Sequence, residues 1–253
     1  MAHYGTAAAH SKADDSPVTA ADFASDRAIA KVLELTGWPV LSEESADDSE
    51  RSRASALWIV DPLDGTREFL AQNGEFSVMI GLVAEGRPVV GAVYLPALDR
   101  LYAASSGHGA WVRDAGQAPR RLQCAPADPA RLRLVGSRSH PDPLVVELQQ
   151  ALGIQDVQPS GSVGIKCAKI AEGARDLYVH PVPYLKEWDT CAPQIILQEA
   201  GGVVSDCTGA ELRYNKRDPS QPHGILAASA DCAAHVADTV IEVYRRRAGV
   251  ADA

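Results

Sequence analysis

The spacing of apolar positions along the chain changes several times, and each change predicts a different element. Between Thr19 and Leu35 apolar residues recur at helical intervals, which predicts a helix that Thr19 caps, with Asp22 as its third residue. Gly37 is expected to end that helix. The polar and charged stretch Ala46–Ser55 that follows predicts a mobile surface loop.

Short apolar runs separated by Gly, Pro and Asp fill the rest of the first half and predict strands. A buried strand is predicted over Leu57–Val60. Four further runs predict an antiparallel meander after it, over Ser77–Val83, Pro88–Tyr94, Leu101–Ala104 and Ala110–Arg113.

From about Leu132 onward, helical and strand patterns alternate. Helices are predicted over Pro143–Leu152, Val163–Glu172, Thr190–Ala200 and about Asp231–Arg246. Strands are predicted over Leu132–Val135, Leu177–Val179, Val203–Ser205 and Ile225–Ala228. An α+β first half and an α/β second half predict one α/β domain over residues 1–253, built from lobes of about 11–122 and 123–253 that share a cleft.

Two carboxylates follow the Leu57–Val60 strand in the run Asp61-Pro-Leu-Asp-Gly-Thr66. Asp61 is expected at the end of the strand, where the sites of α/β sheets usually lie. Pro62 fixes the backbone and Gly65 permits a turn, so Asp61 and Asp64 can converge. Close carboxylates repel unless cations lie between them, and hard cations such as Mg²⁺ prefer oxygen ligands. The spacing alone leaves open a metal site and an Asx-type turn with solvated aspartates.

Composition and charge narrow the possible partners. Of 253 residues, 46% are hydrophobic and 23% charged, as in an ordinary globular protein. No apolar run approaches the roughly 18 residues of a membrane span, and no signal pattern begins the chain, so a cytoplasmic protein is expected. A net charge of −9 argues against a nucleic-acid polymer as partner but is compatible with a small phosphorylated substrate and bound metal ions. The five scattered cysteines predict buried thiols.

Three separated motifs carry a resemblance to a known family. The run Asp61–Thr66, with Leu41-Ser-Glu-Glu44 before it and Glu187-Trp-Asp-Thr190 after it, resembles the inositol monophosphatase superfamily of Mg²⁺-dependent, lithium-sensitive phosphatases. The resemblance extends from about Tyr4 to Leu226. It implies a layered αβαβα sandwich with the site between the two lobes.

Three further segments are similar to one branch of that family, the 3′(2′),5′-bisphosphate nucleotidases of the CysQ type. These segments are Arg67-Glu68-Phe69, Ser11–Thr19 and Asn73-Gly-Glu-Phe76. The implied reaction is removal of the 3′-phosphate of 3′-phosphoadenosine 5′-phosphate, a by-product of sulfate assimilation, to give AMP and phosphate. An inositol-1-monophosphatase or broad sugar-phosphate phosphatase is the alternative, because such enzymes share the metal site. An inactive nucleotide sensor is the alternative from another class.

The resemblance implies a ligand set for two or three Mg²⁺ ions. Its members are Glu43, Asp61, Asp64, Asp189 and the backbone carbonyl of Leu63. Glu44 is expected either to support the ligands from behind or to be structural. From the local sequence alone, the Glu43–Glu44 pair could be solvated and Asp189 could cap a helix.

The resemblance also implies a catalytic pair, Asp22 and Thr66. A threonine hydroxyl backed by a carboxylate can orient the attacking water and take its proton. Asp22 could otherwise serve only in capping with Thr19.

Two segments rich in glycine and serine are candidates for substrate binding, since backbone N–H groups at helix starts bind phosphate. They are Gly136-Ser-Arg-Ser-His140 and Ser160-Gly-Ser-Val-Gly-Ile-Lys166, and each alone is also typical of a turn. The substrate contacts implied by the resemblance are Gly65, Thr66, Ser137, His140, Gly161, Ser162 and Lys166. Lys186 is a weaker candidate, because a lysine there is usually solvated.

The start of the chain is short for this type of protein. Relatives have a long amphipathic helix before the Ser-Lys-Ala-Asp motif, whereas Met1–His10 alone precede Ser11 here. Met1–Thr6 resembles the end of that helix, so we expect a truncated start. We expect the apolar surface uncovered in this way either to leave the protein marginally stable or to be hidden in an oligomer such as a homodimer.

Overall fold

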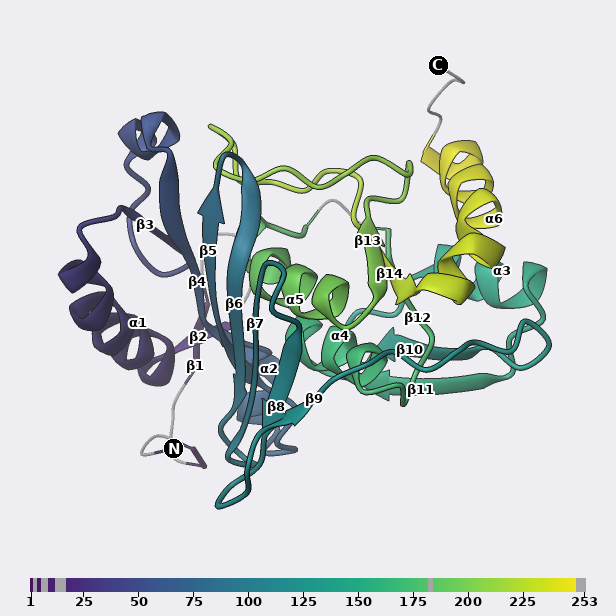
Figure 1. Ribbon diagram of the computed structural model, residues 1–253, viewed down its shortest axis with the longest axis horizontal. Coiled ribbons are helices and arrows are strands. Elements are labelled where there is room, and N and C mark those ends of the chain that lie inside the picture. The colour runs from purple at the N-terminus through teal and green to yellow at the C-terminus, as the bar shows by residue number, and fades with distance from the viewer. Residues whose placement is uncertain (2–3, 6–8, 12–16, 182–183, 249–253) are drawn as a thin grey trace.

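The computed structural model (Figure 1) describes residues 1, 4–5, 9–11, 17–181 and 184–248. Helix, sheet, helices, sheet and helices follow one another as five layers across the molecule. The predicted αβαβα sandwich is therefore confirmed. No helix in the described ranges combines the length and the apolar character needed to cross a membrane.

The first sheet has seven strands in the order β3-β4-β5-β6-β7-β8-β9. Only the pair β3 and β4 is parallel, and the predicted meander forms the antiparallel remainder. The strands are β3 (Val40–Ser42), β4 (Ala56–Asp64), β5 (Ser77–Ala84), β6 (Arg87–Leu95), β7 (Arg100–Ser105), β8 (Ala110–Arg113) and β9 (Arg120–Arg121).

The second sheet has five strands in the order β11-β10-β12-β14-β13. Strands β11, β10 and β12 run parallel, while β14 pairs antiparallel with both β12 and β13. The strands are β10 (Arg133–Ser137), β11 (Asp156–Ser160), β12 (Leu177–His180), β13 (Gly202–Ser205) and β14 (Ile225–Ser229). A separate antiparallel pair joins β1 (Ala9–Ser11) and β2 (Pro17–Thr19).

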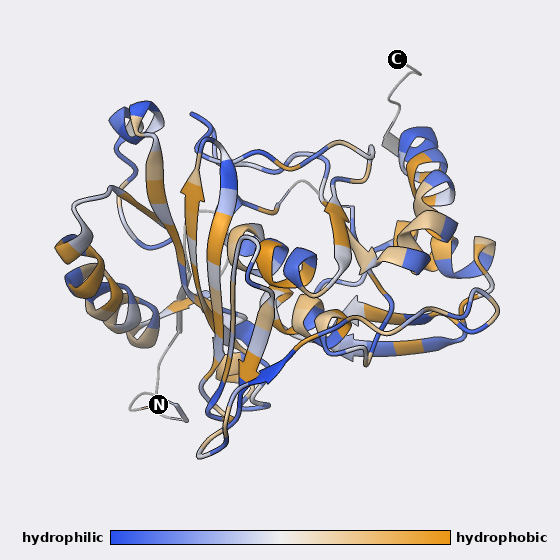
Figure 2. Ribbon diagram, in the orientation of Figure 1, coloured by the Kyte–Doolittle hydropathy of each residue, from blue (hydrophilic) through white to orange (hydrophobic). Residues whose placement is uncertain are grey.

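The helices fill the three other layers (Figure 1). Helix α1 (Ala20–Leu33) lies on the outer face of the first sheet, α4 (Val163–Ala171) and α5 (Glu187–Glu199) lie between the sheets, and α3 (Pro143–Ala151) and α6 (Ala230–Ala248) cover the second sheet. Figure 2 shows hydrophobic residues along the strands of the first sheet and in α5. One cluster of buried hydrophobic residues therefore extends from the first sheet through α4 and α5 to the second sheet.

The beginning of α1 follows the prediction closely. Thr19 accepts a hydrogen bond from the N–H of Ala21, and the Asp22 carboxylate accepts one from the N–H of Thr19, which completes a capping box. A 3₁₀ turn, η1 (Glu34–Thr36), extends α1 to Gly37, whose left-handed φ of 73° ends it.

The mobile loop predicted over Ala46–Ser55 is wrong in its central part. Residues Ser49–Arg53 form a 3₁₀ helix, η2, and Arg51 is only 4% exposed. Its guanidinium donates to Asp47 at 2.6 and 2.8 Å and to Asn215 at 3.1 Å. The bonds to Asp47 hold the segment together, and the bond to Asn215 anchors it to the second half of the chain.

Two elements have different ends from those predicted. Strand β4 continues past Val60 to Asp64, and its pairing with β5 shifts register between Asp61 and Asp64. Pro62 lacks an N–H, which a bulge of this kind tolerates. Helix α5 begins at Glu187, three residues earlier than predicted.

Short or polar elements escaped the sequence pattern. They are β1, β2, β9, β11 and the five-residue helix α2 (Thr66–Leu70). Residues 2–3, 6–8 and 12–16 lie outside the described residues, and with them part of the helix end predicted at Met1–Thr6 and most of the Ser11–Thr19 motif.

Candidate active site

Three carboxylates converge where the first sheet meets the middle layer. Asp61 and Asp64 come from the bulged end of β4, and Asp189 comes from the first turn of α5. One carboxylate oxygen of each lies within 4.8 Å of the other two. Asp61 is 1% exposed and Asp64 is 9% exposed. The convergence of Asp61 and Asp64 predicted from their spacing is therefore present, and Asp189, which only the family resemblance assigned to the site, lies with them.

Burial and mutual repulsion make this cluster electrostatically unfavourable without a cation. Burial raises the pKa of Asp61 well above its usual value, and the charges of Glu43, Asp64 and Asp189 raise it further. The pKa of Asp189 is raised in the same way, first by burial and then by Asp64 and Glu43. Two buried carboxylates and the half-buried Asp189, with their oxygens at this spacing, fit hard divalent cations such as Mg²⁺.

Glu43 and Leu63 lie beside the cluster. The parallel pairing of β3 with β4 sets Ser42 opposite Val60, and the N–H of Glu43 donates to the carbonyl of Val60 at 3.2 Å. This pairing brings the turn after β3 next to Asp61. The N–H of Leu63 donates to the Asp61 carboxylate at 3.0 Å, so the backbone of Leu63 is held close to the same group.

Asp22 and Thr66 are in contact, as the predicted catalytic pair requires. Gly65, at φ 97°, turns the chain in the left-handed conformation that glycine readily adopts, and Thr66 begins α2 directly after it. The Thr66 hydroxyl donates to Asp22 Oδ1 at 3.2 Å. Asp22 Oδ2 accepts from the N–H and hydroxyl of Thr19 at 2.8 and 2.7 Å. Capping and contact with Thr66 therefore use different oxygens and occur together.

The hydrogen-bond donors at the start of α4, which were expected to bind a phosphate of the substrate, bind carboxylates of the protein instead. The hydroxyl of Ser162 and the N–H of Gly164 donate to the same Asp64 oxygen, at 2.5 and 3.1 Å. The N–H of Gly161 donates to Glu75 at 2.9 Å. The helix terminus thus stabilises the ionised form of Asp64, and these bonds oppose the rise that burial causes in its pKa.

Lys166 is the buried cation of the site. Its Nζ lies 5.0 Å from the centre of the Tyr178 ring, and burial lowers its pKa while the charge of Asp64 raises it. The Tyr178 ring in turn stacks with His180, with ring centres 6.2 Å apart. Burial lowers the pKa of His180 to about 3, so this imidazole is neutral at physiological pH.

Lys186 contributes its backbone rather than its side chain. Its N–H donates to Asp189 at 2.6 Å, whereas its Nζ donates to Ser220 at 2.8 Å. Lys186 is the N-cap of α5 and Asp189 is the third residue of the helix. Asp189 therefore takes part in capping by accepting the N–H of Lys186, and is not the N-cap itself. The side chain is therefore engaged elsewhere, and the weaker substrate assignment of Lys186 gains no support.

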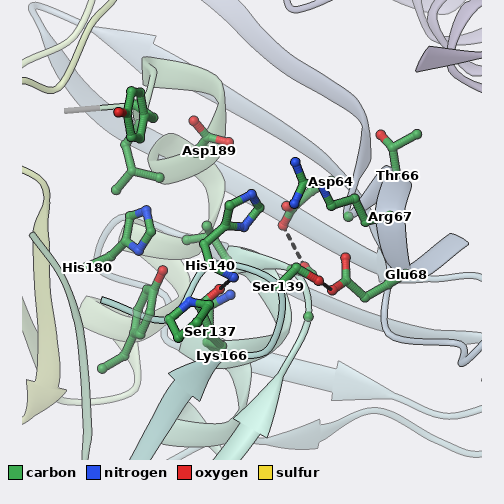
Figure 3. A pocket seen from close by; sticks show the side chains of 18 of the residues that line it. Asp64, Thr66, Arg67, Glu68, Ser137, Ser139, His140, Lys166, His180 and Asp189 are labelled. Atoms are coloured by element: carbon green, nitrogen blue, oxygen red, sulfur yellow. Dashed lines mark hydrogen bonds between the residues drawn. The ribbon is translucent and has the colours of Figure 1, made fainter. Parts of the chain in front are cut away.

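A cavity of about 790 Å³ opens onto the cluster, and its walls come from both halves of the chain (Figure 3). Ten predicted site residues line it: Glu43, Asp64, Gly65, Thr66, Ser137, His140, Gly161, Ser162, Lys166 and Asp189. In the part of the chain that the structure describes, Asp22, Asp61 and Leu63 lie beside these residues without lining the cavity.

Several lining residues were not predicted as site residues. They are Arg67, Glu68, Ser139, Tyr178, His180 and Tyr184. Arg67 and Glu68 belong to a recognised motif and could have been assigned from it. Tyr178 and His180 lie in a strand whose apolar pattern indicated only burial, so no sequence signal pointed to them.

Hydrogen bonds across the cavity mouth fix the loop after β10. Arg138 donates to both carboxylate oxygens of Glu75 at 2.7 and 3.1 Å, and the Ser139 hydroxyl donates to Glu68. A Cβ on Gly161 would lie 2.4 Å from the Glu68 side chain and from the Glu75 carbonyl, so the close approach of the lobes requires glycine there. These contacts hold His140 over the cavity (Figure 3).

Comparisons with known proteins agree with this geometry. The profile of the inositol monophosphatase family matches residues 2–243. The chain is 42% identical to the 3′(2′),5′-bisphosphate nucleotidase CysQ of Salmonella typhimurium over 82% of this chain and 83% of that protein. It is 41% identical to CysQ of Escherichia coli K12 over the same shares of the two chains. The crystal structure of CysQ from Bacteroides thetaiotaomicron matches with a TM-score of 0.75 and 38% identity, covering 86% of each chain.

Proposed function

Because the chain belongs to the inositol monophosphatase family, we propose that it is a 3′(2′),5′-bisphosphate nucleotidase that converts 3′-phosphoadenosine 5′-phosphate to AMP and phosphate. The observation that carries the proposal is the 42% identity to a curated nucleotidase over 82% of this chain. The cavity of about 790 Å³ is within the range that encloses small-molecule ligands and has room for a nucleotide.

We propose Mg²⁺ as the cofactor, with two or three ions held by Glu43, Asp61, Asp64, Asp189 and the carbonyl of Leu63. The convergence of the three aspartates within 4.8 Å supports this assignment. Bound ions would supply positive charge at the phosphoryl oxygens and lower the pKa of a nearby water.

The chain's own residues have two tasks around that centre. Thr66 and Asp22 orient the attacking water, and the Thr66 hydroxyl can accept its proton while donating its own to Asp22 Oδ1, 3.2 Å away. Ser162 and Gly164 hold Asp64 in place and favour its ionised form, so the ligand needs little rearrangement during the reaction.

The substrate carries a second phosphate, which needs positive charge of its own. Lys166 lines the cavity but shares its charge with Asp64. Arg67 lines the mouth, is exposed, and forms no ion pair with the residues that the structure describes. We assign the second phosphate to Arg67 and Lys166 together, with His140 and Ser137 also lining the cavity.

A phosphate-release panel in Mg²⁺ tests the proposal. It compares 3′-phosphoadenosine 5′-phosphate with adenosine 3′-monophosphate, inositol 1-phosphate and a sugar phosphate. We expect the highest kcat/KM with the bisphosphate. A higher kcat/KM with inositol 1-phosphate would favour the inositol monophosphatase alternative, and tight nucleotide binding without release of phosphate would favour a sensor.

A further inference from the structure

Asp26 is a buried carboxylate that the proposed mechanism does not use. It lies on α1 one turn after Asp22 and is 8% exposed. Among the residues that the structure describes it forms no ion pair with a lysine or arginine. Its partners are two hydroxyls: Ser42 donates to Oδ1, and Ser45 donates to Oδ2 at 2.8 Å.

The two serines are the ends of one turn. Ser42 is the last residue of β3, and the chain reverses through Glu43 and Glu44 to reach Ser45. One carboxylate therefore binds both ends of the four-residue segment Ser42–Ser45, which we call the Glu43 turn. The first end is also held by the pairing of β3 with β4, whereas the bond from Ser45 fixes the return of the chain.

Stability alone is a poor reason for a carboxylate at this place. Burying a charged group is unfavourable, and replacing buried polar groups by apolar ones of similar volume is often neutral or stabilising. Groups that orient metal ligands are a different matter, since their loss typically weakens metal binding by 10–100-fold.

We infer that Asp26 is a positioning residue that orients Glu43 for metal binding by fixing both ends of the Glu43 turn. This inference rests on the proposed role of Glu43 as a Mg²⁺ ligand. Helix α1 then supports the site through two carboxylates one turn apart, Asp22 through Thr66 and Asp26 through the Glu43 turn. Neither carboxylate needs to touch the metal.

The test compares three single variants of the full chain. Asp26→Asn keeps the volume but leaves one acceptor oxygen for two hydroxyls. Ser45→Ala removes only the bond at the return of the turn. Asp206→Asn is the matched control, because Asp206 is 9% exposed and also accepts a hydroxyl, that of Thr208, in a loop that does not line the cavity.

The primary readout is the Mg²⁺ concentration at which the Mg²⁺-dependent rise in melting temperature is half complete. We expect this midpoint to increase by about 10-fold in Asp26→Asn and by a smaller factor in Ser45→Ala. At saturating Mg²⁺ both variants should regain a kcat close to that of the wild type. Asp206→Asn should lower the melting temperature without moving the Mg²⁺ midpoint. An unchanged midpoint in Asp26→Asn, or an equal shift in Asp206→Asn, would overturn the inference.

A double variant tests whether Asp26 acts through Glu43. If it does, Asp26→Asn combined with Glu43→Gln should bind Mg²⁺ no more weakly than Glu43→Gln alone. Full additivity of the two effects would contradict the inference. Because the melting assay needs no substrate, it decides the role of Asp26 even if the phosphate-release panel disproves the nucleotidase.

Discussion

Replacing Asp64 by Asn should separate metal binding from folding. The negative charge of Asp64 favours metal binding, but in the metal-free protein it repels the neighbouring carboxylates and so destabilises the fold. The Asn oxygen can still accept the bonds that Ser162 and Gly164 now donate to Asp64. The Asn amide then presents a donor toward Asp61 and Asp189 where a second negative oxygen was. The variant keeps the local structure and loses one of three converging charges.

The size of the effect follows from the spacing of the cluster. Two full charges no more than 4.8 Å apart repel by at least about 3.5 kcal/mol at an effective dielectric of about 20. Raised pKa values of Asp61 and Asp189 show that proton uptake relieves part of this repulsion. We therefore expect Asp64→Asn to stabilise the metal-free protein by about 1–3 kcal/mol. That corresponds to a melting temperature about 2–12 °C higher for a chain of this size.

The assay is thermal unfolding of wild type and variant, first in EDTA and then in saturating Mg²⁺, with phosphate release measured in parallel. In EDTA the variant should melt higher than the wild type. In Mg²⁺ the order should reverse, because the wild type alone gains binding energy. Turnover by the variant should be abolished. A variant that melts lower than the wild type in EDTA, or that keeps most of its Mg²⁺-dependent rate, would refute the reasoning.

Three further predictions concern the same site. Thr66→Ala should lower kcat by about 10²–10⁴-fold with an unchanged Mg²⁺ midpoint, and an unchanged kcat would remove Thr66 from the mechanism. Ca²⁺ should inhibit, because its longer and looser coordination fits a tightly held site poorly, and a rate in Ca²⁺ equal to that in Mg²⁺ would contradict this. The folded-state pKa values of Asp61 and Asp189 are raised, so their stability contribution is complete below about pH 4 and is lost as pH rises through those values. The gain in melting temperature from Mg²⁺ should therefore be larger at pH 8 than at pH 5. An equal gain at the two pH values would contradict this prediction.

The elements that carry regular apolar patterns could be predicted from the sequence. Helix α1 and its capping by Thr19 follow from helical spacing and a local motif, and the meander β5 to β8 follows from turn residues between apolar runs. These features depend on neighbours in sequence. The convergence of Asp61 and Asp64 could be predicted for the same reason, since both lie in one short segment.

Contacts between distant polar residues could not be predicted in this way. The bonds of Arg138 to Glu75 and of Arg51 to Asn215 join segments that no local pattern relates. Strand β11 escaped for another reason, because its residues are mostly exposed and its apolar pattern is weak. The start of α5 was misplaced because the apolar pattern begins only after Thr190, whereas the helix begins at Glu187, a buried carboxylate bound by the N–H groups of Asn215 and Lys216.

The site is held by hydrogen bonds that pass between the lobes and the middle layer, and this arrangement explains why its charges can be buried. Asp64 belongs to β4 but is bound by the start of α4, and Asp189 is bound by the backbone of Lys186 at the start of α5. Each carboxylate thus receives partial positive charge from a helix N-terminus, which favours its ionised form. Two helix termini cannot neutralise three carboxylates and Glu43, since each supplies only about half a charge. Lys166 and proton uptake offset part of the remaining negative charge, and divalent cations would neutralise the rest. The geometry that makes the metal-free cluster unfavourable would therefore favour the binding of divalent ions.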